Sequence, residues 1–198
     1  MTAKRIGIYA GTFDPVHAGH ISFALQAMEA AQLDWIYFMP ERRPRHKPGV
    51  EHYAHRVAMI TRAAQPHPKF RVLELVDISF SVDRTLPKLL QKFPKAQLVF
   101  LFGSDVIAML PQWPHVRRLL EMSELVIGVR AEADAAQLQQ QISDWTYQPI
   151  AVTMFPSFAS DISSSQIRAG LRDQKPVKGL LHSVARYSNR HWLYVSVK

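Results

Sequence analysis

The stretch GTFDPVHAGH, residues 11–20, decides both the fold of this chain and what it can bind. Residues 5–10 before it are mostly apolar and predict a short buried strand. Residues 21–28 after it, ISFALQAM, predict a helix. The stretch therefore lies where a strand ends and a helix begins. Ligands bind at this carboxyl end of the strands in open α/β sheets.

The two histidines of this stretch, His17 and His20, can grip one anion together. They are three positions apart, so the first turn of a helix places both rings on one face. The free N–H groups of that turn and the positive end of the helix dipole favour an anion there. The same field disfavours a protonated imidazole, so we expect neutral rings that donate to phosphate oxygens. Gly11 and Gly19 carry no Cβ and allow a nucleotide to approach the backbone closely.

The rest of the chain alternates between strand-like and helix-like segments. We predict strands over residues 5–10, 35–39, 70–75, 97–102, 124–129 and 150–155. We predict helices over residues 17–31, 52–65, 85–92, 115–121 and 134–143. This alternation predicts an α/β fold with a Rossmann-like parallel sheet and helices on both faces. Residues 163–189 predict a C-terminal helical segment of two helices separated by Lys175-Pro176, and residues 192–195 predict a short final strand.

The composition fits one enzyme-sized domain over residues 1–198, because 47% hydrophobic residues suffice for a sizeable core. The chain has no cysteine, which excludes disulfides, thiolate zinc sites and cysteine nucleophiles and fits a reducing cytoplasm. It has no basic-then-apolar leader and no apolar run near the roughly 20 residues of a membrane span. We therefore expect a cytoplasmic protein without a membrane partner. The net charge of +8 favours anionic partners, either nucleotides or nucleic acids.

A second candidate site begins at residues 162–170, ISSSQIRAG. Ser163 and Gln166 have the spacing of a capping box, so the pattern fits a plain helix start. The same pattern presents hydroxyls and free N–H groups at a helix N-terminus, with Arg168 close enough to meet a phosphate. The residues alone favour both interpretations about equally.

Two further features follow the fourth predicted strand. Asp105, in Gly103-Ser104-Asp105, emerges at the same sheet edge as the histidine pair. A carboxylate there can accept hydrogen bonds from ribose hydroxyls, or it can cap the next helix. Trp113 is held in a stiff turn between prolines, where it either joins the core or serves as a platform for a ligand.

Cationic residues follow two other predicted strands at this edge. The loop ERRPRHKP, residues 41–48, carries five potential cations after the second strand. Such a run is usually solvated, but its location makes His46 and Lys47 candidates for contact with a substrate phosphate. Arg130 ends the fifth predicted strand and is a candidate for the same crevice.

Together these segments resemble the nucleotidyltransferase superfamily, whose phosphate-binding motif has the form of residues 11–20. The chain is most similar to the bacterial nicotinate-nucleotide adenylyltransferase family, because GSD, PQW and ISSSQIR recur in the same order at residues 103–105, 111–113 and 162–168. The resemblance covers nearly the whole chain. It implies transfer of AMP from ATP to nicotinate mononucleotide, with release of pyrophosphate and formation of deamido-NAD.

The resemblance also implies roles for individual residues. The catalytic residues would be His17, His20 and Arg168. The ATP-binding residues would be Gly11, Thr12, Phe13, Gly19, Gly103, Asp105, Ile162, Ser164 and Ser165. The acceptor-binding residues would be His46, Lys47, Thr85, Trp113 and Arg130. Mg²⁺ is expected to be carried with ATP, and no residue is assigned as a metal ligand because the sequence has no Asp/Glu cluster typical of a dedicated site.

The chain departs from the family at residues 80–86, FSVDRTL. The family usually has a Ser-Tyr-Thr run followed by Thr-Leu, and its backbone helps recognise the nicotinate carboxylate. Thr85 and Leu86 fit, whereas the Tyr-Thr pair is replaced, and Asp83 and Arg84 have opposite effects on a carboxylate. A second hypothesis is therefore a transferase for another phosphorylated acceptor, such as nicotinamide mononucleotide. A third, a nucleic-acid-binding protein without catalysis, has only the basic charge in its favour.

Overall fold

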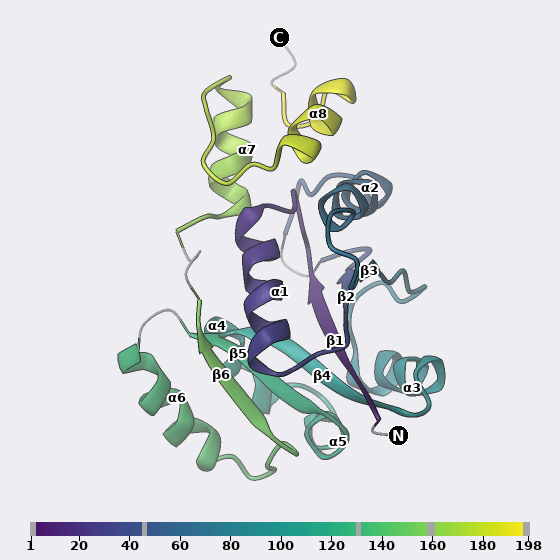
Figure 1. Cartoon of the computed structure of the whole chain (residues 1–198), viewed down its shortest axis with the longest axis vertical. Coiled ribbons are helices and arrows are strands. Elements are labelled where there is room, and N and C mark those ends of the chain that lie inside the picture. Colours follow the sequence, from purple (N-terminus) through teal and green to yellow (C-terminus); the bar gives the residue numbers. More distant parts are fainter. Residues whose placement is uncertain (1–2, 45–46, 130–131, 158–160, 196–198) are drawn as a thin grey trace.

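The computed structural model describes residues 3–44, 47–129, 132–157 and 161–195, and its strands form one parallel sheet (Figure 1). The strands are β1 (Lys4–Gly11), β2 (Trp35–Pro40), β3 (Phe70–Val72), β4 (Ala96–Gly103), β5 (Glu124–Val129) and β6 (Val152–Pro156). Their order is β3-β2-β1-β4-β5-β6, and every neighbouring pair is parallel. The order reverses direction between β1 and β4. The carboxyl ends of these two strands are therefore the expected place for a ligand.

Helices cover both faces of this sheet. They are α1 (Ala18–Ala30), α2 (Tyr53–Ala64), α3 (Val82–Lys92), α4 (Ser104–Ile107), the 3₁₀ turn η1 (Leu110–Gln112), α5 (Val116–Met122), α6 (Glu132–Ser143), α7 (Ser164–Arg172) and α8 (His182–Arg190). Alternate residues of β4 face two separate cores, since Leu101 packs with α1 and α2 while Phe100 packs with α3 and α5. A parallel strand covered on both faces needs such a continuous apolar run.

The predicted α/β fold with a parallel sheet and helices on both faces is confirmed. The short elements α4 and η1 were not expected, because four or three residues carry too little periodicity to be recognised. None of the helices within the described ranges is long and apolar enough to cross a membrane.

The predicted final strand at residues 192–195 is wrong. The tail continues from α8 as a turn, in which Leu193 N donates to Ser188 O at 2.9 Å. Trp192 and Tyr194 have positive φ values of 54° and 62°, which no strand residue adopts. Leu193 and Tyr194 are apolar or aromatic because they are buried in the core beside α1 and α2. Burial, and not strand pairing, explains the pattern of this segment.

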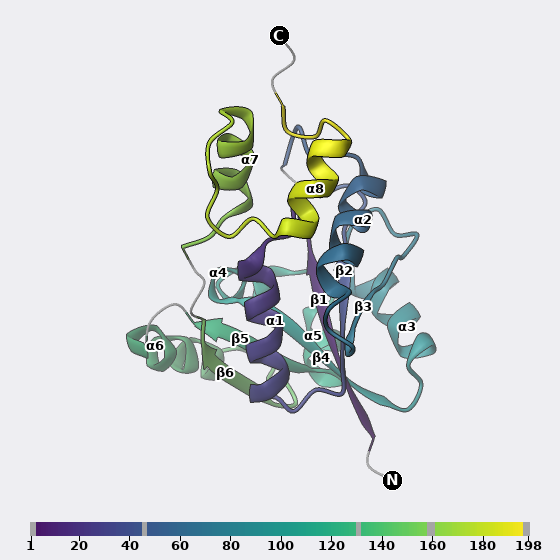
Figure 2. The same ribbon diagram turned by 45° about the horizontal axis from the view of Figure 1, so that its top comes forward.

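The two C-terminal helices lie beyond the carboxyl edge of the sheet, close to the start of α1 (Figures 1 and 2). The segment between them contacts α1, since Ala18 N donates to Gly179 O at 2.8 Å. Helix α8 packs along α2, where the Tyr187 hydroxyl lies 3.0 Å from Nδ1 of His55. The fold thus places α7 and α8 directly beside the end of β1.

Gly128 of β5 has no room for a side chain, which gives a prediction for stability. A Cβ there would lie 2.3 Å from Cε2 of Phe23, whose ring packs against Tyr9 and Phe155 with centroids 5.1 Å apart in each case. Gly128→Ala should therefore lower the free energy of unfolding by about 1–3 kcal/mol, measured by urea denaturation. Adding Phe23→Leu should recover part of that loss. An unchanged urea midpoint for the single variant would contradict the tight packing.

Candidate active site

The loop between β1 and α1, residues 12–17, turns sharply against the end of β1. Phe13 is buried with a φ of 52°, a left-handed conformation rare for a bulky residue. Its ring packs edge-on against Tyr9, with centroids 5.3 Å apart. A Cβ on Gly11 would lie 2.9 Å from Cζ of Phe13. Glycine at position 11 is therefore required for Phe13 to fold back over the strand end.

The rings of His17 and His20 lie together at the start of α1, with centroids 3.7 Å apart and planes 32° from parallel. His17 N donates to Nδ1 of His20 at 3.2 Å. Since Nδ1 of a neutral His20 is the acceptor here, its Nε2 carries the proton and is the donor. Within the described chain, the buried Nδ1 of His17 has no hydrogen-bond partner. The two rings thus lie side by side at the start of the helix, as the spacing of the histidines predicts.

Both histidines are held neutral at pH 7. Burial lowers the pKa of His17 from 6.5 to about 4. Burial also lowers the pKa of His20 well below its usual value, with smaller contributions from the charges of His17 and Lys47. Both shifts have the direction that the sequence predicts, and desolvation is their largest cause. Neutral imidazoles can donate to an arriving phosphate without first losing a proton.

Two cavities lie beside the histidines, and His17 and Ile162 line both of them. The smaller one, here called the histidine cavity, has a volume of about 210 Å³ and is lined by Tyr9, His17, Gly19, His20, Phe23, Gly103, Ser104, Asp105, Gly128, Ser157 and Ile162. The larger one, here called the serine cavity, has a volume of about 480 Å³ and is lined by Thr12, Phe13, Asp14, His17, Lys47, Pro48, Val50, Ile162, Ser163, Ser164, Ser165 and Arg168.

Most of the predicted nucleotide-binding residues line one cavity or the other. Gly19, Gly103 and Asp105 line the histidine cavity, and a Cβ on Gly103 would lie 2.5 Å from Oδ1 of Asp105. Thr12, Phe13, Ile162, Ser164, Ser165 and Arg168 line the serine cavity. Gly11 lines neither of them and instead lies beneath Phe13. The structure therefore brings together three sequence segments that are far apart in the chain.

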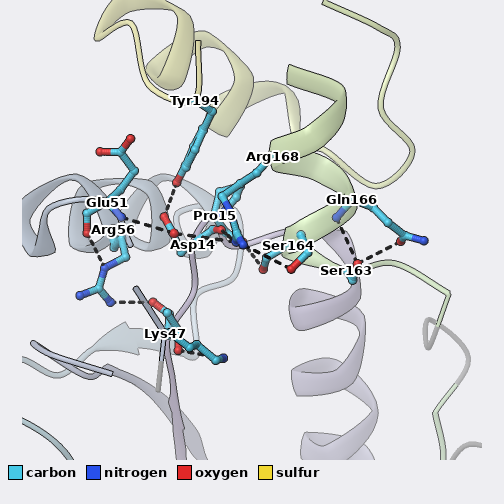
Figure 3. Close-up of polar contacts among 12 residues, drawn as sticks. Asp14, Pro15, Lys47, Glu51, Arg56, Ser163, Ser164, Gln166, Arg168 and Tyr194 are labelled. Carbon is cyan, nitrogen blue, oxygen red and sulfur yellow. Dashed lines mark hydrogen bonds and ion pairs between the residues drawn. The ribbon is translucent and has the colours of Figure 1, made fainter. Parts of the chain in front are cut away.

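Helix α7 begins beside the β1–α1 loop (Figure 3). Ser163 is its N-cap and accepts from Gln166 N at 3.3 Å, which confirms the predicted helix start. Ser164 Oγ donates to Pro15 O at 3.0 Å. Arg168 donates from Nη1 to Asp14 O at 2.7 Å and from Nη2 to Ser165 Oγ at 3.3 Å. The helix start is thus both a capped terminus and a wall of the serine cavity.

The predicted acceptor-binding residues are more scattered. Lys47 Nζ donates to Thr12 Oγ1 at 3.2 Å and lines the serine cavity. Thr85 is buried, and its Oγ1 accepts from Ser81 N at 3.1 Å and bonds to Asp77 at 3.2 Å, so this hydroxyl holds the start of α3. Trp113 packs against Phe80 and Phe102, with ring centroids 5.8 Å apart in both pairs. Neither Thr85 nor Trp113 lines the two cavities. His46 and Arg130 lie outside the described residues.

Sequence reasoning missed Arg56 of α2. It is 1% exposed, and its guanidinium donates to Thr12 O at 2.6 Å, Glu41 O at 2.7 Å, Glu51 O at 3.0 Å and Arg42 O at 3.1 Å. Burial lowers its pKa, while the Asp14 carboxylate is the largest opposing influence. The sequence does carry a signal for the burial of Arg56. It lies three residues before Met59 and four before Ile60, so it shares the apolar face of the helix with them.

The described residues contain no group of three or more His, Cys, Asp or Glu side chains placed to hold a metal ion. Basic and hydroxyl groups predominate around the serine cavity, where Asp14 is the one carboxylate among its lining residues. Divalent magnesium prefers carboxylate oxygens and water. The donor set of this site therefore fits an anion better than a bare divalent cation.

Comparisons with known proteins agree with this geometry. A model of the family described as cytidylyltransferase-like matches residues 8–170. Nicotinate-nucleotide adenylyltransferase of Bacillus subtilis is 35% identical over 201 aligned positions, covering 98% of this chain and 100% of the relative. A relative from Neisseria meningitidis is 30% identical, with 96% of this chain and 98% of the relative covered.

A solved structure shares the fold. Nicotinic acid mononucleotide adenylyltransferase of Plasmodium falciparum, complexed with NaAD, superposes with a TM-score of 0.77 at 21% identity, covering 96% of this chain and 97% of the other. The family model and the relatives show that the chain is a nucleotidyltransferase of the cytidylyltransferase-like class. Within that class, the chain belongs to the nicotinate-nucleotide adenylyltransferase family.

The buried neutral histidine makes stability depend on pH. In the unfolded chain His17 takes up a proton below pH 6.5, whereas in the folded chain it does so only near pH 4. The free energy of unfolding therefore falls as the pH drops through this range. The full effect is about 3 kcal/mol. In urea titrations at pH 7 and 4.5, His17→Gln should show a smaller loss of stability on acidification than the wild type. Equal losses for the two proteins would contradict the neutral state of His17.

Proposed function

We propose that this chain transfers AMP from ATP to nicotinate mononucleotide, releasing pyrophosphate and forming deamido-NAD. The observation that carries the proposal is the neutral histidine pair at the start of α1, in which His17 lines both the histidine cavity and the serine cavity and His20 lines the former. The identity of the acceptor is inferred from the relatives, which are named nicotinate-nucleotide adenylyltransferases. One domain over residues 1–198 and a cytoplasmic setting, both expected from the sequence, belong to the same proposal.

The reaction requires no covalent intermediate on the protein. An acceptor phosphate oxygen attacks the α-phosphorus of ATP in line, the bond to the bridging oxygen breaks, and pyrophosphate leaves. Negative charge grows on the phosphate oxygens, and fixed donors stabilise it without reorganising. His17 and His20 would supply such donors, since His20 presents Nε2–H and both rings are uncharged before substrate binds.

The two cavities divide the nucleotide between them in this proposal. The serine cavity would hold the leaving phosphates, because Arg168 and the start of α7 bring a cation and free donors to it. The histidine cavity would hold the adenosine, with Asp105 on the ribose hydroxyls. Gly11, Gly19 and Gly103 would allow the close approach that this requires.

The acceptor would bind at the remaining predicted residues. Among them, Lys47 contacts the β1–α1 loop through Thr12 and would bind the phosphate of the acceptor. His46 and Arg130 are expected to contribute to the same acceptor phosphate. Trp113 would stack on the pyridine ring, and Thr85 would fix the start of α3 beside it. Mg²⁺ would enter as part of the ATP complex, held by phosphate oxygens and water, because the described part of the chain has no cluster of three or more His, Cys, Asp or Glu side chains for it.

Replacing one histidine tests the catalytic assignment. His20→Ala should lower kcat by roughly 10²-fold or more, the scale of losing one preorganised donor, measured by pyrophosphate release. His67→Ala is the matched control, because His67 precedes β3 at the opposite edge of the sheet. A normal rate for His20→Ala would remove this residue from the mechanism.

A panel of acceptors tests the substrate. With ATP as donor, nicotinate mononucleotide should give a kcat/KM at least tenfold above nicotinamide mononucleotide, a difference of about 1.4 kcal/mol. The 80–86 segment carries exposed charges of both signs, since the Ser81 hydroxyl lowers the pKa of Asp83 and keeps it ionised beside Arg84. The expected preference therefore rests on the family of the relatives. The reverse preference would assign the altered 80–86 segment to nicotinamide. Activity with neither acceptor would reject the proposed function.

A further inference from the structure

Asp14 joins the β1–α1 loop to three distant parts of the chain (Figure 3). Its side chain is 2% exposed. Oδ1 accepts from the Tyr194 hydroxyl at 2.6 Å, and Oδ2 accepts from Glu51 N at 3.4 Å. Arg168 Nη1 lies 3.8 Å from Oδ2 and donates to the Asp14 carbonyl oxygen at 2.7 Å. The bond from Tyr194 is therefore the shortest that this buried carboxylate receives.

The side chain of Tyr194 is held in place by burial, and its hydroxyl bonds to Asp14. It is 8% exposed and packs in the core with Leu193 and Val184. Burial and the Asp14 carboxylate both raise its pKa, so the phenol stays protonated and donates at any working pH. Trp192 and Tyr194 have positive φ values, a conformation rare for L side chains, and in this conformation the Tyr194 hydroxyl reaches Asp14. Tertiary contacts, and not local preference, hold this segment in place.

We propose that Tyr194 is a positioning residue for nucleotide binding, which acts through Asp14 on Arg168. A buried carboxylate that loses its best donor must find another. Arg168 is the nearest cation, so the guanidinium would turn from Asp14 O and Ser165 Oγ toward the carboxylate. That turn removes the arginine from its place in the wall of the serine cavity. The inference rests on the proposed function only in taking the serine cavity as the phosphate site.

Removal of single hydroxyls tests this role. Tyr194→Phe keeps the ring and its packing, and should lower kcat/KM for ATP roughly tenfold, mainly through a higher KM. Tyr187→Phe is the matched control, because it removes a hydroxyl from nearby α8 that bonds to His55 and not to the β1–α1 loop. Its kinetics should stay within twofold of the wild type. Kinetics of Tyr194→Phe equal to those of Tyr187→Phe would overturn the proposal.

A double variant separates positioning from general stabilisation. A neutral amide at position 14 loses less free energy than a carboxylate when the bond from the phenol is removed. Tyr194→Phe should therefore have a smaller effect on KM in an Asp14→Asn background. A purely structural role would give equal effects in both backgrounds. Thermal unfolding of each single variant shows whether the protein under assay is folded. Equal effects on KM, in proteins that remain folded, would overturn action through Asp14.

Binding of the non-reactive analogue α,β-methylene-ATP makes the test independent of the acceptor. By titration calorimetry, Tyr194→Phe should bind the analogue roughly tenfold more weakly than the wild type and Tyr187→Phe. If the wild type turns over no acceptor but this difference holds, the proposed function fails and the role of Tyr194 stands. Equal affinity for all three proteins overturns the role of Tyr194 alone. Failure of the wild type to bind the analogue overturns both.

Discussion

The site depends on hydrogen bonds that fix the backbone carbonyl oxygens around the end of β1. Four such oxygens each accept from a donor elsewhere in the chain. The pairs are Gly11 with Glu41 N, Thr12 with Arg56, Asp14 with Arg168 and Pro15 with Ser164. Leaving one of these oxygens inside the protein without its partner costs free energy, so the bonds favour one conformation of the loop. This fixed loop also fixes the position of His17 and His20, which lie at its end and in the first turn of α1.

Burial then sets the chemistry of the histidines. A charged imidazole is disfavoured where it loses water, so the pair is uncharged at pH 7, while cations gather at the edge of the neighbouring cavity. The guanidinium of Arg168 has both a structural role and a proposed role in binding. It holds the β1–α1 loop from α7 and also lines the serine cavity. Preorganised donors of this kind stabilise developing charge better than mobile ones.

Local patterns in the sequence predicted the sheet and the two helix starts well. The apolar residues within 97–102 and 124–129 are buried, as expected of strands inside a parallel sheet that is covered on both faces. Ser163 and Gln166 cap α7 across three residues, a contact that any chain with this spacing can form. The tail at 192–195 was misjudged because apolar residues signal burial, and burial alone does not distinguish a strand from a packed turn.

The sequence by itself determined the alternation of strands and helices and the motif of residues 11–20, because both depend on neighbours within a few positions. Tertiary structure alone decided which donors reach the loop. Arg56 lies 44 positions from Thr12, and Tyr194 lies 180 positions from Asp14. Such contacts, and the lowered pKa of His17, depend on how α2 and the C-terminal segment pack at the edge of the sheet. Neither spacing nor composition encodes that packing directly, since burial is a property of the whole fold.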